Sequence, residues 1–386
     1  MIIRKLEKET DFEQFAEVSA SAYIYNIEET EFEEDVDNFG AFINDGKTLI
    51  SQMECSFRKS IYCQKPLICA SVGGVASKPE YRRLGGVREI FNKVFTYSRE
   101  KGAHISILFP FSIGYYRKFG YETIFSYINA ECSFKVFERI ERFSQLTLAT
   151  IEHKDILSDI YKTLTLKNHM MFTRENGKDF CFEPYKKSKF TYFYSEENSK
   201  GYITFTPHRP TRTLNVEELL FTDKNVLAKL LGFLRMYEGN YDFVSFTKLP
   251  LNSPVFSIIG DENNLVKRTL HYGGSGRILD ITAVLSANEY PMEKGSFSLK
   301  ITDEQIPENN GIYTVEYENG VGTVRKNESD FYDLSLDAPA AARVLLGGEG
   351  LNADQISYIP NTEVKTDCKD FAKAFPARTT LFYDSF

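Results

Sequence analysis

Residues 72–88 read VGGVASKPEYRRLGGVR, which predicts a strand, a basic turn and a helix in that order. The helix begins near Gly86, because apolar residues then recur at helical spacing until Gly102 ends it. The free N–H groups of a first helical turn and the helix dipole attract anions, and Arg82 and Arg83 add charge. The segment therefore predicts a cradle for a pyrophosphate, although glycines before a helix are also typical of ordinary turns.

A second segment supports the cradle. Residues 105–109 predict a short buried strand, and it leads through Pro110 into IGYYRKFGYE at 113–122. The chain contains neither the GKS or GKT of a P-loop nor a GxGxxG of the Rossmann type. Two other common phosphate-binding motifs are thus excluded.

The order of strands and helix occurs twice. Strands over 201–205 and 213–220, a helix over 223–237 and a strand over 242–246 repeat the pattern, but the basic glycine turn is replaced by FTDKN at 221–225. We read this as a duplicated module that lost its loop chemistry. The last hundred residues differ: they predict a three-stranded meander over 296–326, followed by helices over 338–346 and 367–375. Glycines 273, 274 and 276 are interpreted as a loop or hairpin turn before a strand.

The segments 72–88 and 105–122 together resemble the GNAT acyl-CoA N-acetyltransferases. The VGGVA, PEYRR and GG spacing, the length of 386 residues, the second module and the terminal Phe resemble, more narrowly, the Eis (enhanced intracellular survival) family. The resemblance implies an α+β fold with two GNAT-like domains and a sterol-carrier-like domain, assembled as a hexamer. We expect the domains at 1–145, 146–285 and 286–386.

The resemblance also implies a binding site for acetyl-CoA as co-substrate. Val75 and Ser77 would pair through their backbone with the pantetheine arm. The pyrophosphate would be held by the residues of the turn and the first helical turn: Arg82, Arg83, Gly85, Gly86 and Val87. Two positions depart from the pattern: Val87 replaces the usual small residue, and Phe111 stands where that branch often has Ser.

Tyr116 falls at the position of the family's general acid. A CoA thiolate must leave when the tetrahedral intermediate collapses, and a nearby phenol can protonate its sulfur. The alternative is a core aromatic residue, in a chain that is 14% aromatic. For the base, the resemblance implies the C-terminal carboxylate of Phe386, which would accept the proton of the amine or orient it; the alternative is a simply packed terminus.

Charge and composition exclude several classes. The net charge is −8 and no long basic run occurs, so we expect no nucleic-acid partner. The five histidines and six cysteines lack metal-ligand spacing, which predicts no metal and fits a reduced, cytoplasmic setting. The apolar stretch 105–116 is too short to span a membrane, and the N-terminus lacks the pattern of a secretory signal.

The acidic stretch near the N-terminus is compatible with a cationic substrate. Seven carboxylates fall within residues 28–37, and they form either a solvated surface or an acidic wall that attracts a cation. We expect an N-acetyltransferase that acts by direct transfer on a primary amine, with aminoglycosides or lysine side chains as the candidates that the resemblance implies. The alternative is a non-catalytic acyl-CoA or lipid-binding protein that uses the sterol-carrier-like domain.

Overall fold

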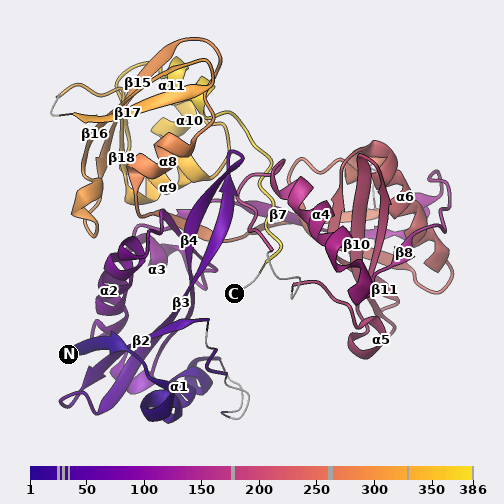
Figure 1. The fold of residues 1–386 in the computed structure, drawn as a ribbon, viewed down its shortest axis with the longest axis horizontal. Coiled ribbons are helices and arrows are strands. Elements are labelled where there is room, and N and C mark those ends of the chain that lie inside the picture. The colour runs from indigo at the N-terminus through magenta and orange to yellow at the C-terminus, as the bar shows by residue number, and fades with distance from the viewer. Residues whose placement is uncertain are drawn as a thin grey trace.

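The fold consists of three β-sheets with their covering helices (Figure 1). The computed structural model describes residues 1–23, 27, 31–33, 35–174, 179–259, 264–327 and 330–384. In Figure 1 the first sheet lies at lower left, the second at right and the third at upper left. The prediction of a mixed α and β fold is confirmed.

The first sheet has seven strands and contains the predicted cradle. Its strand order is β1 (Ile2–Lys5), β2 (Asp37–Ile43), β3 (Thr48–Tyr62), β4 (Lys65–Ser77), β5 (Ile105–Leu108), β14 (Ser275–Ile278) and β6 (Glu122–Thr123). Helix α2 (Gly86–Glu100) buries its apolar face against one side of this sheet, and α1 (Lys8–Tyr23) packs on β3 and β4. Both helices match the sequence pattern.

Strands β4 and β5 pair over only part of their length. Their parallel register runs from Cys69 opposite Ile105 to Val72 opposite Leu108. Beyond Val72 the strand β4 continues to Ser77 and carries an irregularity in its pairing with β3, between Gln52 and Glu54. One edge of β4 is therefore open past Val72, where the family resemblance implies backbone pairing with a pantetheine arm.

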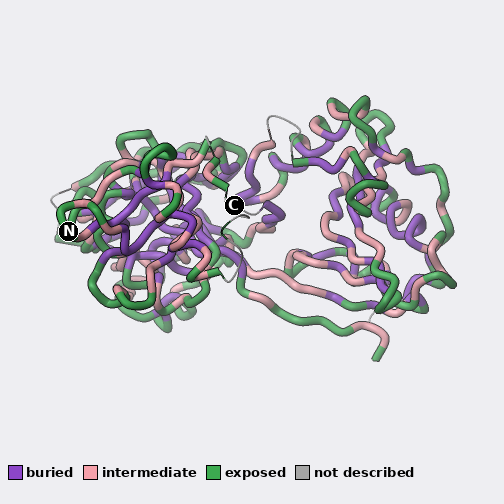
Figure 2. The backbone as a smooth tube through the Cα atoms, turned by 90° about the horizontal axis from the view of Figure 1, so that it is seen from below, coloured by how far each residue is buried: buried purple, intermediate pink, exposed green. Residues whose placement is uncertain are grey.

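The first two sheets exchange strands. After β6 the chain enters the second sheet as β7 (Ser126–Ser133), and after β13 (Val266–Tyr272) it returns to the first sheet as β14. Figure 2 shows the neighbouring strands that connect the part of the molecule with the first sheet to the part with the second sheet. The domain boundaries near residues 145 and 285 stay predictions.

The interpretation of Gly273–Gly276 as a loop or turn is wrong for its second half. Ser275 and Gly276 are buried in β14, between β5 and β6. A Cβ on Gly276 would lie 2.7 Å from Cδ1 of Ile124, so this glycine lets the strand pack closely rather than turn.

The second sheet repeats the architecture of the first, as predicted. Its strand order is β13, β7, β12 (Phe243–Pro250), β11 (Thr213–Phe221), β10 (Ser199–His208), β9 (Phe190–Glu196) and β8 (Thr147–Leu148). The helices α4 (Lys154–Thr165) and α6 (Lys224–Leu234) pack on it. Strand β11, helix α6 and strand β12 correspond to β4, α2 and β5 of the first module.

The third sheet carries the predicted meander. Its strand order is β17 (Val321–Asn327), β16 (Gly311–Glu318), β15 (Gly295–Thr302), β18 (Leu334–Asp337) and β19 (Glu363–Val364). The helices α8 (Ile281–Ala287), α9 (Ala338–Leu346) and α11 (Lys369–Ala374) accompany it, and one apolar core joins this unit to the first sheet. Further short helices are α3 (Ile113–Arg117), α5 (Pro184–Lys187), α7 (Val255–Ile259) and α10 (Ala353–Ser357).

Candidate active site

The turn before α2 has the geometry of an anion cradle. Gly85 is the N-cap of α2 with φ of 87°, and Arg83 has φ of 69°, so the chain turns sharply into the helix. Open space surrounds the Cα of Gly85, whereas a Cβ on Gly86 would lie 2.5 Å from Oγ of Ser51. Gly86 thus seats the helix on β3, and Gly85 leaves room for a ligand to approach the backbone.

The charged groups of the cradle face solvent. Arg82 and Arg83 are exposed, and among the described residues neither forms an ion pair. Val87 is half-buried and packs against the core between α2 and the sheet. Two guanidinium groups and the first N–H groups of a fifteen-residue helix therefore meet at one place, which suits a pyrophosphate.

The open edge of β4 next to this cradle contains Val75 and Ser77, the residues that are expected to pair with the pantetheine arm. The side chain of Ser77 is held by a 2.7 Å hydrogen bond between its Oγ and that of Ser51. The carbonyl of Val75 accepts a 3.3 Å hydrogen bond from the hydroxyl of Tyr23, the last residue of α1. Tyr23 consequently covers the strand position at which the pantetheine arm is expected.

Tyr116 lies in the short helix α3 (Ile113–Arg117), whose first turn Ser112 caps by accepting a 3.3 Å hydrogen bond from the N–H of Tyr115. The ring is 3% exposed and contacts Phe91 and Tyr121 edge-on. Burial, with the nearby hydroxyls of Tyr23 and Tyr115, raises the pKa of Tyr116 well above its usual value. The phenol is therefore protonated at neutral pH, as a proton donor requires.

The aromatic residue Phe111 is 75% exposed, and its ring centroid lies 5.4 Å from that of Tyr116. It stands at the surface beside the buried phenol and also contacts Tyr115. An exposed ring at this place offers an apolar contact to whatever approaches Tyr116.

An acidic cavity of about 200 Å³ lies on the first sheet beside the β4 irregularity. Its lining includes Glu31, Glu33 and Glu54, with Arg58 as the one cation among its lining residues. Burial and the neighbouring Glu33 raise the pKa of Glu54, and this side chain packs against the backbone of Gly74. The cavity thus adjoins the strand position next to Val75.

Glu54 could not be predicted as a site residue, because a lone Glu within a strand gives no motif. The acidic residues 28–37 were predicted as a possible wall for a cation. Of these, Glu31 and Glu33 line the cavity, whereas Glu28, Glu29 and Glu34 lie outside the described residues. Phe386 also lies outside the described residues, which end at Asp384.

The C-terminal segment runs between the two GNAT-like modules up to Asp384. The ring of Phe382 stacks on Phe125 at 4.8 Å and contacts Phe109 edge-on at 5.7 Å. Phe109 directly follows β5, the strand beside the open edge of β4. The tail therefore reaches the first module close to its predicted site.

Within the described parts of the chain, no group of His, Cys, Asp and Glu side chains has the arrangement of a metal site. The helices of the same parts include none with the length and apolar character needed to cross a bilayer.

Comparison with known domains accounts for all three units. A family model for an acetyltransferase (GNAT) domain matches residues 3–124, and a second one matches residues 171–278. The chain carries two GNAT acetyltransferase domains. A sterol carrier protein domain model matches residues 281–382, so the expected domain types and their order are confirmed. The GNAT domains place the chain among the acyltransferases and imply the use of an acyl-CoA co-substrate.

Solved structures share the whole architecture. A probable N-acyltransferase from Enterococcus faecalis V583 is 20% identical with a TM-score of 0.83, over 100% of this chain and 99% of its own. A GCN5-related N-acetyltransferase from Anabaena variabilis is 15% identical with a TM-score of 0.84, over 100% of both chains. Eis1 from Mycobacterium abscessus is 16% identical with a TM-score of 0.81, again over 100% of both chains. The chain thus shares the fold of Eis1, as the resemblance to the Eis family implies.

No curated protein matches the chain at a significant level.

Proposed function

We propose that the chain is an acetyl-CoA-dependent N-acetyltransferase that acetylates a primary amine of a cationic substrate by direct transfer. One observation carries the proposal: the β4 irregularity at Gly74 and Val75 is next to both a buried tyrosine and an acidic cavity. Glu54 packs against Gly74, while Tyr23 bonds the carbonyl of Val75 and lies near Tyr116. These contacts support an acyl acceptor and a proton donor next to the same strand.

The cofactor site follows from the same geometry. Acetyl-CoA supplies the thioester whose acetyl group is transferred. Arg82, Arg83, Gly85, Gly86 and Val87 would hold its pyrophosphate at the start of α2, where the open backbone at Gly85 fits a phosphate. The backbone of Val75 and Ser77 would pair with the pantetheine arm along the edge of β4 that β5 leaves unpaired, and the arm would displace the hydroxyl of Tyr23 from the carbonyl of Val75.

The acceptor is bound through its charge. Glu31, Glu33 and Glu54 give the cavity an excess of carboxylates, so an ammonium group of an aminoglycoside-like molecule or of a lysine side chain is attracted. The C-terminal carboxylate of Phe386 would take a proton from this ammonium or orient the amine. A carboxylate has a low pKa in water, so this role requires a partly desolvated position.

The transfer would proceed through a tetrahedral intermediate. The free amine attacks the thioester carbonyl, the C–N bond forms, and the tetrahedral intermediate collapses as the C–S bond breaks. Tyr116 gives its phenolic proton to the departing sulfur. The products are the acetylated amine and the CoA thiol, and the proton released by the amine restores the phenol through solvent or the terminal carboxylate.

The test is release of CoA thiol from acetyl-CoA at pH ~8, which is close enough to the usual lysine pKa of about 10.4 that a small part of the amine is unprotonated. The acceptors are aminoglycosides, polyamines and lysine peptides. We expect release with one amine class, and loss of that release when Phe386 is removed. Binding of acetyl-CoA without turnover of any acceptor, together with lipid that co-purifies in native mass spectrometry, would favour the alternative, a non-catalytic acyl-CoA or lipid-binding protein.

The hexamer and the cytoplasmic setting stay predictions that rest on the resemblance. Light scattering tests the first, since a monomeric mass would contradict a hexamer.

A further inference from the structure

The second GNAT domain has a counterpart of the acyl-CoA cleft. Strands β11 and β12 pair in parallel from Thr213 opposite Phe243 to Val216 opposite Phe246, and then part. Val216 therefore corresponds to Val72, the last paired residue of β4, and Leu219 corresponds to Val75 three positions later. Strand β11 also changes register against β10 near this point, as β4 does against β3.

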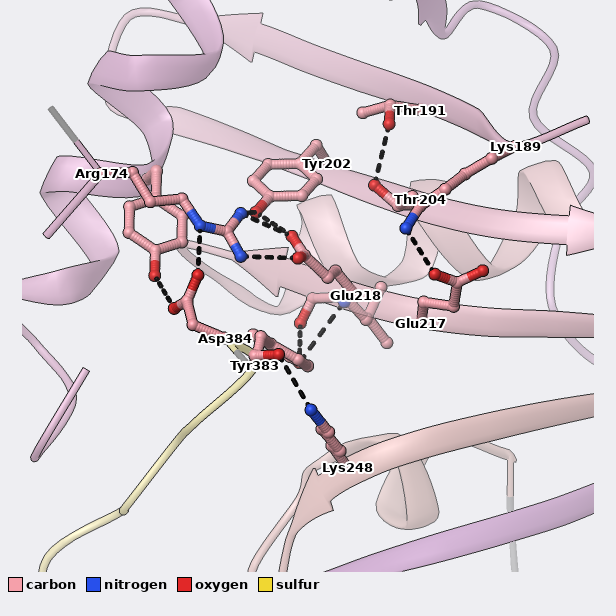
Figure 3. A network of polar contacts seen from close by, with 12 residues as sticks. Arg174, Lys189, Thr191, Tyr202, Thr204, Glu217, Glu218, Lys248, Tyr383 and Asp384 are labelled. Atoms are coloured by element: carbon pink, nitrogen blue, oxygen red, sulfur yellow. Dashed lines mark hydrogen bonds and ion pairs between the residues drawn. The ribbon is translucent and has the colours of Figure 1, made fainter. Parts of the chain in front are cut away.

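The C-terminal segment of the chain fills this counterpart. The hydroxyl of Tyr383 accepts a 3.4 Å hydrogen bond from the N–H of Leu219 and donates a 3.2 Å bond to its carbonyl (Figure 3). Both backbone groups of the strand position that corresponds to Val75 are thus taken by a side chain of the same molecule. A pantetheine arm would have to displace Tyr383, which is 7% exposed.

A buried ion network fixes the next residue of the segment. Nε of Arg174 donates to Asp384 at 2.9 Å, and its Nη2 donates to Glu218 at 2.7 Å. The hydroxyl of Tyr161 donates to the other oxygen of Asp384 at 3.1 Å. The side chain of Arg174 is 4% exposed and that of Asp384 is 7% exposed, so this pair is shielded from solvent.

A third contact holds the main chain of the tail. Nζ of Lys248 donates to the carbonyl of Tyr383 at 2.9 Å. Lys248 lies within the irregularity in the pairing of β12 with β7, between Phe246 and Leu249. Its φ is 55°, a conformation that few non-glycine residues adopt. Its N–H bonds the side chain of Asn129 at 3.1 Å, which stabilises this conformation.

The geometry points to a new role for the second GNAT domain. We infer that its former acyl-CoA cleft is the seat of the C-terminal segment, and that Arg174 is a positioning residue that acts through Asp384. By holding Asp384, two residues before Phe386, it sets where the terminal carboxylate lies relative to the first domain. The inference rests on the proposed function of that carboxylate.

The first experiment compares Asp384→Asn with the control Asp179→Asn. Asp179 lines the same cavity of about 340 Å³ but forms no ion pair among the described residues. We expect Asp384→Asn to lower kcat by about 10-fold to 100-fold, because a small displacement of a reacting group costs this much. KM for acetyl-CoA stays unchanged, since the cradle is in the first domain, and Asp179→Asn behaves as wild type.

Two further variants separate positioning from folding. Asp384→Glu keeps the charge that Arg174 binds, so it should recover a part of kcat. Lys248→Met loosens the tail without removing the buried network and should lower kcat at an unchanged Tm. If Asp384→Asn and Lys248→Met turn over at the wild-type rate while removal of Phe386 abolishes activity, the positioning role is overturned and the proposed function stands.

The occupied cleft has its own readout, which does not depend on turnover. Isothermal titration calorimetry of the full chain with acetyl-CoA should give one site per chain. Two sites per chain would overturn the assignment of the second cleft to the tail, whatever the activity shows. If removal of Phe386 leaves turnover unchanged, the proposed base fails and the positioning role of Arg174 fails with it.

Discussion

Tyr116 is a buried phenol with no hydrogen-bond partner among the described residues, so its proton is available to a bound thioester sulfur. Replacement by Phe removes one oxygen and leaves the aromatic packing in place. We expect Tyr116→Phe to lower kcat by about 100-fold or more, because general acid catalysis contributes at least this much, with KM for acetyl-CoA nearly unchanged. Tyr115→Phe removes the same atom one residue away and is the matched control. Equal turnover of both variants would contradict the acid assignment.

The pH dependence of the wild type follows from the same residue. Because burial raises the pKa of Tyr116 above its usual value of 10.0, its protonated form persists to higher pH than in a free tyrosine. Turnover should rise with pH as the amine loses its proton, and it should show no descending limb below pH 10. A steady-state pH profile of kcat tests this. A descending limb near pH 8 would mean that a group more acidic than a tyrosine phenol carries the step.

Gly120, in the FGYE part of the motif, has a structural reason to be glycine. Its φ is 78°, and a Cβ would overlap Nη1 of Arg277. This arginine is fully buried, and its Nη2 donates a 2.7 Å hydrogen bond to Asp303. We expect Gly120→Ala to destabilise the fold by about 2–4 kcal/mol, from backbone strain and overpacking. Gly114→Ala is the control, because open space surrounds Gly114. Thermal unfolding should show a clearly lower Tm for the first variant alone.

At the scale of elements, the turn between β4 and α2 carries the two arginines that we expect to bind the cofactor's phosphates. Arg82→Gln with Arg83→Gln removes two exposed cations from the turn. KM for acetyl-CoA should rise by about 10-fold or more, since each charge-assisted bond to phosphate contributes about 1.5 kcal/mol or more, while kcat at saturation is retained. The control removes the same charge from α5, as Lys186→Gln with Lys187→Gln. An equal KM in both doubles would place the pyrophosphate elsewhere.

Elements whose pattern is local could be predicted from the sequence. Helix α2 and strand β4 could be predicted because their apolar patterns depend on their own residues. The repeat of the same order around α6 could be predicted for the same reason. The exchange of β7 and β14 between sheets could not be predicted, because strand pairing over such separations leaves no local signal. The position of Glu54 could not be predicted for the same reason, because its burial beside Gly74 depends on the pairing of β3 with β4. Tyr116 was found through its motif, whereas its high pKa depends on tertiary burial.

At the scale of the whole molecule, His169 lies where all three domains and the tail meet. Its ring packs on Tyr62 of β3 at 4.9 Å, Nε2 lies 2.9 Å from the carbonyl of Leu346 in α9, and its N–H donates to the carbonyl of Thr379 in the tail. Burial, followed by the charge of Arg378, lowers the pKa of His169 from 6.5 to about 4. The imidazole is therefore neutral in the folded chain at pH 5, whereas in the unfolded chain it is protonated.

This difference links the assembly of the domains to pH. Since the unfolded state binds a proton that the folded state does not, stability is retained above pH 6.5 and is lost as pH falls from 6.5 towards 4. The loss from this one group is about 2 kcal/mol at pH 5. His169→Gln has no titrating group, so its Tm should fall less than that of the wild type between pH 7 and pH 5. Parallel falls of Tm in both proteins would show that the imidazole titrates freely, and that the contact between tail and domains opens to solvent well before the chain unfolds.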